Sequence, residues 1–176
     1  MSEINSVVDP DASMGSEQLQ IFIDAHRIEA VILPMGGHTS TVSEAALALA
    51  VETDQIIKSL VFRTQTEPLL VINNGLARVD RRKLAAGLGV GRKRVKFASP
   101  EQALALTGFV VGSMPPFGHR APLRTLVDRG VVQHENVYGG GGAGDTMMRL
   151  TTRELVAFTG AEVVDIAVPA PMPRDD

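Results

Sequence analysis

Two neighbouring strands joined by a short turn constrain the fold of this chain more than any other feature of its sequence. Residues 56–63 read Ile-Ile-Lys-Ser-Leu-Val-Phe-Arg, and their β-branched and aromatic side chains are typical of a strand. Residues 64–68 favour a turn, residues 69–72 form a second apolar segment, and Asn73-Asn74-Gly75 is a strong turn signal. The sequence therefore predicts two adjacent antiparallel strands.

Lys58 is unusual within the first of these strands. Side chains alternate between the two faces of a strand, so Lys58 shares a face with Leu60 and Phe62. If this face packs against the core, the ammonium needs an anion or loses its charge, because an unpaired buried charge is costly. If the sheet is thin there, the side chain reaches water instead. The sequence leaves both interpretations open.

The rest of the chain predicts short helices and short strands in alternation. Four helices are expected after a capping residue: residues 17–26 after Ser16, residues 81–88 after Asp80, residues 100–107 after Ser99 and residues 153–158 after Thr152. A fifth helix is expected to begin at the capping box that Thr41 and Glu44 form. The further strands are expected at residues 30–34, 95–97, 109–111, 123–127, 131–138, 147–150 and 162–168.

These elements predict an α/β chain of the α+β type. The strands are short and mostly adjacent in sequence, which favours a mixed, mostly antiparallel, barrel-like sheet with helices packed outside over a doubly wound sheet. We expect a disordered tail at residues 1–15, a single domain at residues 16–168 and a polar tail at residues 169–176.

Several classes of site are excluded by what the chain lacks. It has no cysteine, which excludes disulfides, thiolate zinc sites and cysteine nucleophiles. Its four histidines have no metal-ligand spacing, and there is no P-loop, dinucleotide fingerprint or Gly-x-Ser-x-Gly motif, so we expect no metal and no cofactor. No apolar run is long enough to cross a bilayer, and the start of the chain does not resemble a signal peptide. We expect a cytoplasmic protein without a membrane partner.

Positive charge is concentrated in one segment of a chain whose net charge is −3. Residues 78–96 hold eight basic residues and one acidic residue, whereas the remainder holds nine basic and nineteen acidic residues. A compact basic patch on an acidic body is typical of a protein that contacts one segment of a polyanion. A solvated helix face is an equally good interpretation of the charge alone.

Two glycine-rich loops are the remaining candidates for a site. Residues 108–120 read Gly-Phe-Val-Val-Gly-Ser-Met-Pro-Pro-Phe-Gly-His-Arg, and residues 139–142 are all glycine. Such loops hold backbone N–H groups in a concavity that a ligand can approach closely, although a rigid turn and a flexible hairpin are the simpler alternatives. Together with Lys58 they would form a site suited to an ester or phosphate beside a small acyl group.

At these residues the chain resembles the YbaK/prolyl-tRNA-synthetase-associated domain family, which comprises free-standing aminoacyl-tRNA deacylases that clear mischarged tRNA. The resemblance covers about residues 20–168, and the lysine strand followed by the glycine-proline loop is specific as a pair. The matching blocks are Ala45-Ala46, residues 57–61, residues 70–72, Gly108-x-x-x-Gly112-Ser113-x-x-Pro116-x-Gly118, residues 139–142, and residues 155–166.

The resemblance implies a mixed, barrel-like α/β fold and a set of site residues. The lysine of the family falls on Lys58, near the terminal adenosine phosphate, and its loop glycine falls on Gly112 or the neighbouring Ser113, whose amides orient the aminoacyl carbonyl. These three are the expected catalytic residues, with no covalent enzyme intermediate. The residues expected to bind substrate are Ser59, Thr41, His38, Met114, Pro116, Phe117, Gly118, Gly140, Gly141, Gly142 and Asp145, with Met147 as the alternative to Asp145.

The leading hypothesis is a metal-independent trans-editing hydrolase that acts on the ester of a misacylated tRNA, with tRNA for proline as one candidate. Its partners would be the acceptor end of aminoacyl-tRNA and an aminoacyl-tRNA synthetase. A non-catalytic tRNA- or nucleotide-binding module and hydrolysis of another acyl ester are the alternatives. His119 and Arg120 either face the tRNA or are solvated. The residues expected to contact tRNA phosphates are Arg81, Arg82, Lys83, Arg92, Lys93 and Arg94.

Overall fold

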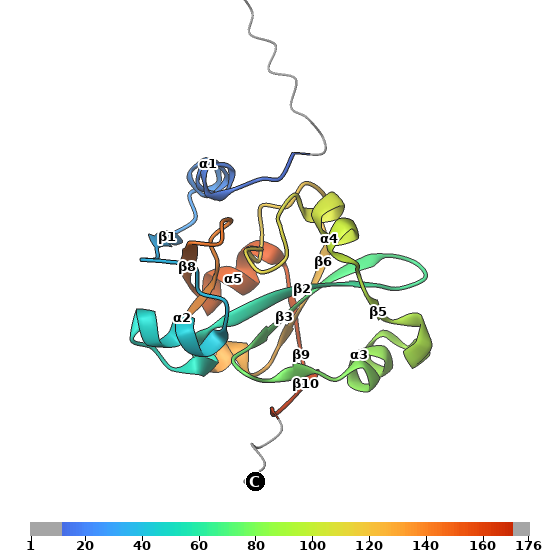
Figure 1. Ribbon diagram of the computed structural model, residues 1–176. Helices are drawn as coiled ribbons and strands as arrows, with labels where there is room; N and C mark the ends of the chain where they lie inside the picture. The colour runs from blue at the N-terminus through green and yellow to red at the C-terminus, as the bar shows by residue number, and fades with distance from the viewer. Residues whose placement is uncertain (1–11, 171–176) are drawn as a thin grey trace, which may run out of the picture.

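The computed structural model describes residues 12–170 (Figure 1). Its largest sheet has the strand order β5-β2-β3-β6-β9. The two strands predicted to be adjacent, β2 (Ile57–Arg63) and β3 (Pro68–Asn74), pair in antiparallel register with Lys58 opposite Asn73. The strands that complete this sheet are β5 (Lys96–Phe97), antiparallel to β2, and β6 (Arg124–Asp128) and β9 (Glu162–Val164), which run parallel to β3 and β6 respectively.

Two smaller sheets accompany the large one. An antiparallel sheet has β8 (Thr146–Thr151) at its centre, between β1 (Val31–Pro34) and β7 (Asn136–Gly140). The third sheet pairs β4 (Arg78–Val79) with β10 (Ala167–Val168). The mixed, mostly antiparallel α+β fold with outer helices is therefore confirmed, and within residues 12–170 the strands form three sheets and no closed barrel.

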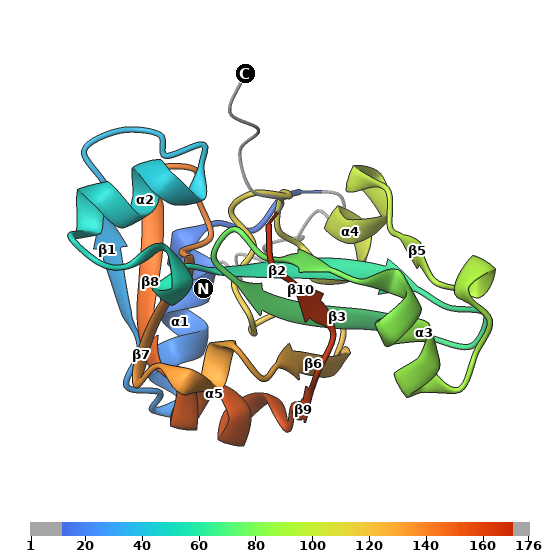
Figure 2. The ribbon, with the colours of Figure 1, turned by 90° about the horizontal axis from the view of Figure 1, so that it is seen from below.

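Five α-helices cover the sheets in the described part of the chain. They are α1 (Ser16–His26), α2 (Val42–Leu49), α3 (Arg81–Leu88), α4 (Pro100–Thr107) and α5 (Thr152–Thr159), with 3₁₀ turns η1 (Thr53–Gln55), η2 (Arg92–Arg94) and η3 (Val131–Gln133). The caps at Thr41, Asp80 and Ser99 are confirmed. Helices α2 and α3 lie at opposite ends of the molecule (Figure 2).

The sequence misplaced two helix caps by one residue. The N-cap of α1 is Gly15, because the hydroxyl of Ser16 donates to the carbonyl of Gly141 at 2.7 Å instead of capping its own helix. The cap of α5 is Thr151, whose hydroxyl accepts from the amide of Glu154. The tails predicted at residues 1–15 and 169–176 lie mostly outside the described residues.

Three predicted strands are wrong in part or in whole. Residues 109–111 form no strand, because the chain leaves α4 through Gly108 at φ +83° and turns again at residues 110–113. Residues 131–138 begin as η3 and become a strand only at Asn136. Residues 162–168 break into β9 and β10, because the amides of Ile166 and Ala167 bond to a side chain instead of a neighbouring strand.

Both faces of the large sheet are buried, and Lys58 lies on one of them. On the opposite face, Ile57 and Val61 join a core formed with α1, α4 and α5. On the face of Lys58, the fully buried Phe62 packs against Leu84 of α3 and against Leu69. The predicted alternation along β2 is therefore confirmed, and the lysine lies on a face that is mostly apolar.

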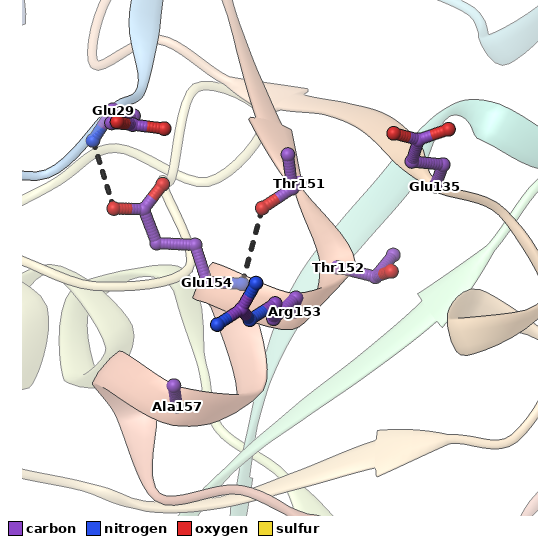
Figure 3. Close-up of a pocket in the computed structure, with 7 residues that line it drawn as sticks. All are labelled: Glu29, Glu135, Thr151, Thr152, Arg153, Glu154 and Ala157. Atoms are coloured by element: carbon purple, nitrogen blue, oxygen red, sulfur yellow. Dashed lines mark hydrogen bonds between the residues drawn. The ribbon is translucent and has the colours of Figure 1, made fainter.

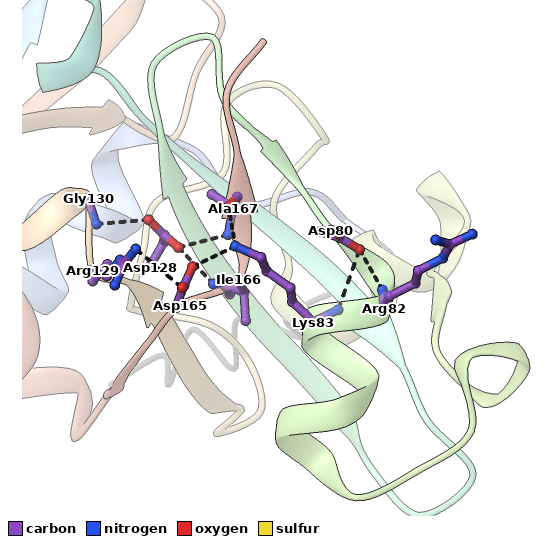
Figure 4. Close-up of polar contacts among 9 residues, drawn as sticks. All are labelled: Asp80, Arg82, Lys83, Asp128, Arg129, Gly130, Asp165, Ile166 and Ala167. Carbon is purple, nitrogen blue, oxygen red and sulfur yellow. Dashed lines mark hydrogen bonds and ion pairs between the residues drawn. The ribbon is translucent and has the colours of Figure 1, made fainter. Parts of the chain in front are cut away.

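Asp128 fastens the C-terminal strands to the sheet (Figure 4). Its side chain is 4% exposed, and its carboxylate accepts from the amides of Gly130, Ile166 and Ala167 at 2.8–2.9 Å. We expect Asp128→Ala to lower the free energy of unfolding by about 2–4 kcal/mol, because it strands buried amides that bond to a charged acceptor.

Asp165 provides the matched control for this substitution. It is a neighbouring aspartate whose side chain is 43% exposed and forms surface ion pairs with Lys83 and Arg129. Asp165→Ala should cost about 1 kcal/mol or less, because exposed ion pairs contribute little. Denaturant unfolding of the two variants measures the difference, and equal losses would contradict the anchoring role of Asp128.

Candidate functional site

Two adjoining cavities lie where α2, the start of β2 and the two glycine-rich loops meet. The inner cavity has a volume of about 250 Å³ and the outer cavity about 590 Å³. Thr39, Ser40, Val111 and Gly112 line both, so the two are continuous at this boundary. The structure thus brings together the lysine strand and both glycine loops, which are far apart in the sequence.

Gly112 lies at the boundary because residues 110–113 form a tight turn. The amide of Ser113 donates to the carbonyl of Val110 at 3.1 Å, and Gly112 takes φ +98°, as the third residue of a type II turn does. A Cβ at Gly112 would point into open space. Among residues 12–170, no hydrogen bond uses the Gly112 amide, which therefore remains available to a ligand.

Ser113 lines the outer cavity and also joins the two glycine loops through its own hydrogen bonds. Its hydroxyl and its amide both donate to Val110, and its carbonyl accepts from the amide of Gly142 at 2.9 Å. Gly140 completes this contact, because a Cβ there would overlap the carbonyl groups of Ser113 and Met114. Of the two neighbours in the loop, only Gly112 has an amide free to bind an oxygen.

Lys58 lines the inner cavity and is half-buried. Its ammonium donates to the carbonyl of Ala77 at 2.9 Å, so neither interpretation drawn from the sequence is fully correct: the partner is a backbone oxygen, not an anion, and the side chain does not simply extend to water. Burial and the neighbouring Arg78 lower the pKa of Lys58. Within residues 12–170 no carboxylate forms an ion pair with this ammonium.

The other expected substrate-binding residues separate into two groups. One group lines the cavities: Thr41, Ser59, Met114 and Gly140 the inner one, and His38 and Gly142 the outer one. The other group lies elsewhere. Gly141 is buried and accepts from Ser16, Asp145 is exposed and lines neither cavity, and Pro116, Phe117 and Gly118 line a separate cavity of about 240 Å³ beside α1 and α5.

Aromatic packing explains why the end of the glycine-proline loop leaves the site. Phe117 is 4% exposed and lies 5.9 Å from Phe22 and 5.4 Å from Phe158, measured between ring centroids. His119 is partly buried, its Nε2 donates to the carbonyl of Pro115 at 2.8 Å, and burial lowers its pKa. These residues anchor the loop to the core.

Sequence reasoning missed the apolar wall of the inner cavity. Val42 and Ala45 of α2 line it together with Ile56, Ile57 and Met147. The small residues of α2 indicated close packing, but they did not indicate against what. Met147, named above only as an alternative to Asp145, takes that place because β8 turns its side chain inward.

The basic segment at residues 78–96 divides into inward and outward residues. Arg81 donates to the carbonyl of Val95 at 3.1 and 2.6 Å, and Lys83 bonds to Asp165 at 2.9 Å (Figure 4). Both side chains are thus bonded within the protein, although the ion pair of Lys83 lies at the surface. The residues of the predicted tRNA-binding set that are exposed are Arg82, Arg92, Lys93 and Arg94.

A further cavity, of about 520 Å³, is lined mainly by acidic residues, in contrast to the basic segment (Figure 3). Three carboxylates line it, from Glu29, Glu135 and Glu154, with Arg153 as the one cation. Such a surface repels a polyanion. Within residues 12–170 no cluster of side chains is suited to hold a metal ion, and no helix has the length and apolar character needed to cross a membrane.

Comparison with known proteins identifies a family for this chain. Residues 37–158 match the family described as the aminoacyl-tRNA editing domain. The chain is 28% identical over 126 residues to the uncharacterized protein YwhH of Bacillus subtilis (strain 168), which covers 71% of this chain and 78% of YwhH. It is 29% identical over 141 residues to a proline–tRNA ligase of Nitratidesulfovibrio vulgaris (strain DP4), which covers 79% of this chain and 24% of the ligase.

The fold is shared with solved structures as well. A crystal structure described as a "putative trans-editing enzyme for prolyl tRNA synthetase" superposes with a TM-score of 0.80 at 31% identity. The match covers 92% of this chain and 99% of that one. The chain therefore spans nearly the whole of this structure but about a quarter of the ligase.

Proposed function

Since the chain belongs to the aminoacyl-tRNA editing domain family, we propose that it is a trans-editing deacylase that hydrolyses the ester of a mischarged tRNA. The observation that carries this proposal is the amide of Gly112, which has no hydrogen-bond partner among residues 12–170 and lies at the boundary of a cavity that Lys58 also lines. A backbone amide binds a carbonyl oxygen, and an ammonium binds a phosphate. The end of an aminoacyl-tRNA offers both groups.

In the proposed mechanism the protein supplies position and charge, and water supplies the nucleophile. The ester carbonyl oxygen accepts from the Gly112 amide, which stabilises the negative charge that develops when water adds to the carbonyl carbon. The bond from that carbon to the ribose oxygen then breaks, and the ribose oxygen takes up the proton that the attacking water releases. Lys58 pairs with the phosphate of the terminal adenosine and so fixes the ester in place.

The inner cavity favours a small aminoacyl group. Its volume is about 250 Å³, and its wall is apolar where Ala45 and Met147 lie and polar where Ser59 and Thr41 lie. A small amino acid on tRNA for proline is therefore the first substrate to test, and the similarity to proline–tRNA ligases supports that choice. A synthetase is the corresponding candidate partner.

Release of amino acid from a panel of mischarged tRNAs tests the proposal. The protein should deacylate at least one small misacylated species, and it should leave correctly charged prolyl-tRNA intact. Binding without release from any member would support the non-catalytic alternative. Release from simple aminoacyl esters at equal rates would support a general esterase instead.

We propose that the outward arginines of η2 contact tRNA phosphates. Arg92→Ala combined with Arg94→Ala should weaken tRNA binding several-fold and reduce the salt slope by about 1–2, because each phosphate contact releases about one counterion. The matched control is Arg149→Ala with Arg153→Ala, two exposed arginines elsewhere on the protein. Fluorescence anisotropy at several salt concentrations measures both. An equal effect of the two pairs would mean that only net charge matters.

A further inference from the structure

Asn73 lies opposite Lys58 near one end of the β2–β3 strand pair. The two residues are paired in the β2–β3 register, so their side chains project from the same face and lie side by side. Asn73 is fully buried, whereas Lys58 is half-buried at the inner cavity. An apolar core does not require a buried amide. The position of Asn73 beside Lys58, the one cation that lines this cavity, therefore points to another role.

Both side chains bond to one oxygen. The carbonyl of Ala77 accepts from the Lys58 ammonium at 2.9 Å and from the Asn73 side-chain nitrogen at 2.8 Å. This carbonyl belongs to the turn between β3 and β4, and the turn is itself held by the bond from the Gly75 amide to the carbonyl of Ile56 at 2.7 Å. The carbonyl that binds Lys58 is thus held in place both by Asn73 and by the turn to which it belongs.

The Asn73 side-chain oxygen is left without a partner. It is the one buried side-chain nitrogen or oxygen within residues 12–170 that has no hydrogen bond. The nitrogen must face Ala77, because the reverse orientation would place two oxygens together. The unpaired oxygen therefore makes the electrostatic potential near Lys58 more negative. It carries no full charge, so it does not compete with a phosphate for the ammonium.

We propose that Asn73 is a positioning residue for Lys58, which holds the ammonium at the cavity through the shared Ala77 carbonyl and leaves it free for the substrate phosphate. This inference rests on the proposed function for its catalytic meaning. A carboxylate at the same place would trap the ammonium, and an apolar side chain would release the Ala77 carbonyl.

The first test uses no substrate. The pKa of Lys58 can be followed by NMR of ¹³Cε-labelled lysine, with the signal assigned from its loss in Lys58→Arg. Asn73→Asp should raise this pKa by about one unit or more, because it places a carboxylate opposite the ammonium, while Arg78 is unchanged. Asn74→Asp is the matched control, since Asn74 is the adjacent buried asparagine and bonds instead to the carbonyls of Asp54 and Gly130. An equal response of the two variants would overturn the proposal.

The second test uses deacylation. Asn73→Leu should lower kcat/KM about tenfold to a hundredfold while the protein stays folded, since misplacing a positioned group has effects of this size. In the Lys58→Ala background the same change should have no further effect, because there is no ammonium left to position. Independent, additive losses would overturn the proposal. If the wild-type protein releases no amino acid, the proposed function fails, and the NMR result still decides whether Asn73 controls Lys58.

Discussion

Replacement of Lys58 by alanine should lower kcat/KM for deacylation by about a hundredfold to a thousandfold, the range observed when one preorganised donor is removed from a site. The loss follows from the position of Lys58 in the wall of the inner cavity, because its ammonium is the group that pairs with the substrate phosphate in the proposed mechanism. The fold should be retained, because the Ala77 carbonyl keeps its bond from Asn73. Amino acid release and thermal unfolding, measured on the same preparation, separate these two effects.

Arg63→Ala is the control for the loss of a cation from the same strand. Arg63 is the last residue of β2 and is exposed, so its removal should leave kcat within about twofold. Release that survives Lys58→Ala would keep the enzyme but would exclude Lys58 from the site. Equal losses in both variants would indicate a general effect of charge on tRNA binding.

The same assignment predicts how the wild-type rate depends on pH. Burial lowers the pKa of Lys58 below its ordinary value near 10.5, so the ammonium loses its proton at a lower pH than an exposed lysine does. The enzymatic rate should therefore fall in that alkaline range, once the spontaneous hydrolysis of the ester is subtracted. No such fall should remain in Lys58→Ala.

Local signals in the sequence were enough to predict the part of the fold that carries the site. The alternation along β2 and the turn at residues 64–68 fixed the strand pair and placed Lys58 on the face of Phe62. Asn73 and Asn74, which were expected to begin a turn, are instead the last two residues of β3. The capping residues located most helices, because each cap acts within one turn of chain. The resemblance to the editing family, drawn from the lysine strand and the loop at residues 108–118, is confirmed by the match over residues 37–158.

What the sequence could not give depends on contacts between distant segments. Phe117 belongs to a motif that looked like part of the site, but its ring packs against Phe22 and Phe158, and nothing local to the loop indicates those partners. The sequence does not distinguish Arg81 from its exposed neighbours, but in the structure its guanidinium donates to the carbonyl of Val95. Which of the Gly112 and Ser113 amides is left for a ligand likewise depends on the turn at residues 110–113, because the Ser113 amide donates to Val110 within that turn.

Gly112→Ala should reduce deacylation about as strongly as the loss of Lys58, by about a hundredfold or more. The residue takes φ +98°, which an alanine adopts only with strain, and a Cβ there would occupy the open space at the boundary of the two cavities. The substitution therefore both moves the amide and blocks the oxygen that it would bind.

Gly89→Ala separates the effect on the site from the effect on the backbone. Gly89 caps α3 at φ +67°, and a Cβ there also meets open space, so both variants should lose about 1 kcal/mol of stability. Only Gly112→Ala should lose activity, because α3 lies at the opposite end of the molecule from the cavity wall formed by α2 (Figure 2). If the two variants keep equal activity, the Gly112 amide does not bind the ester, and the carbonyl must be held by another part of the cavity.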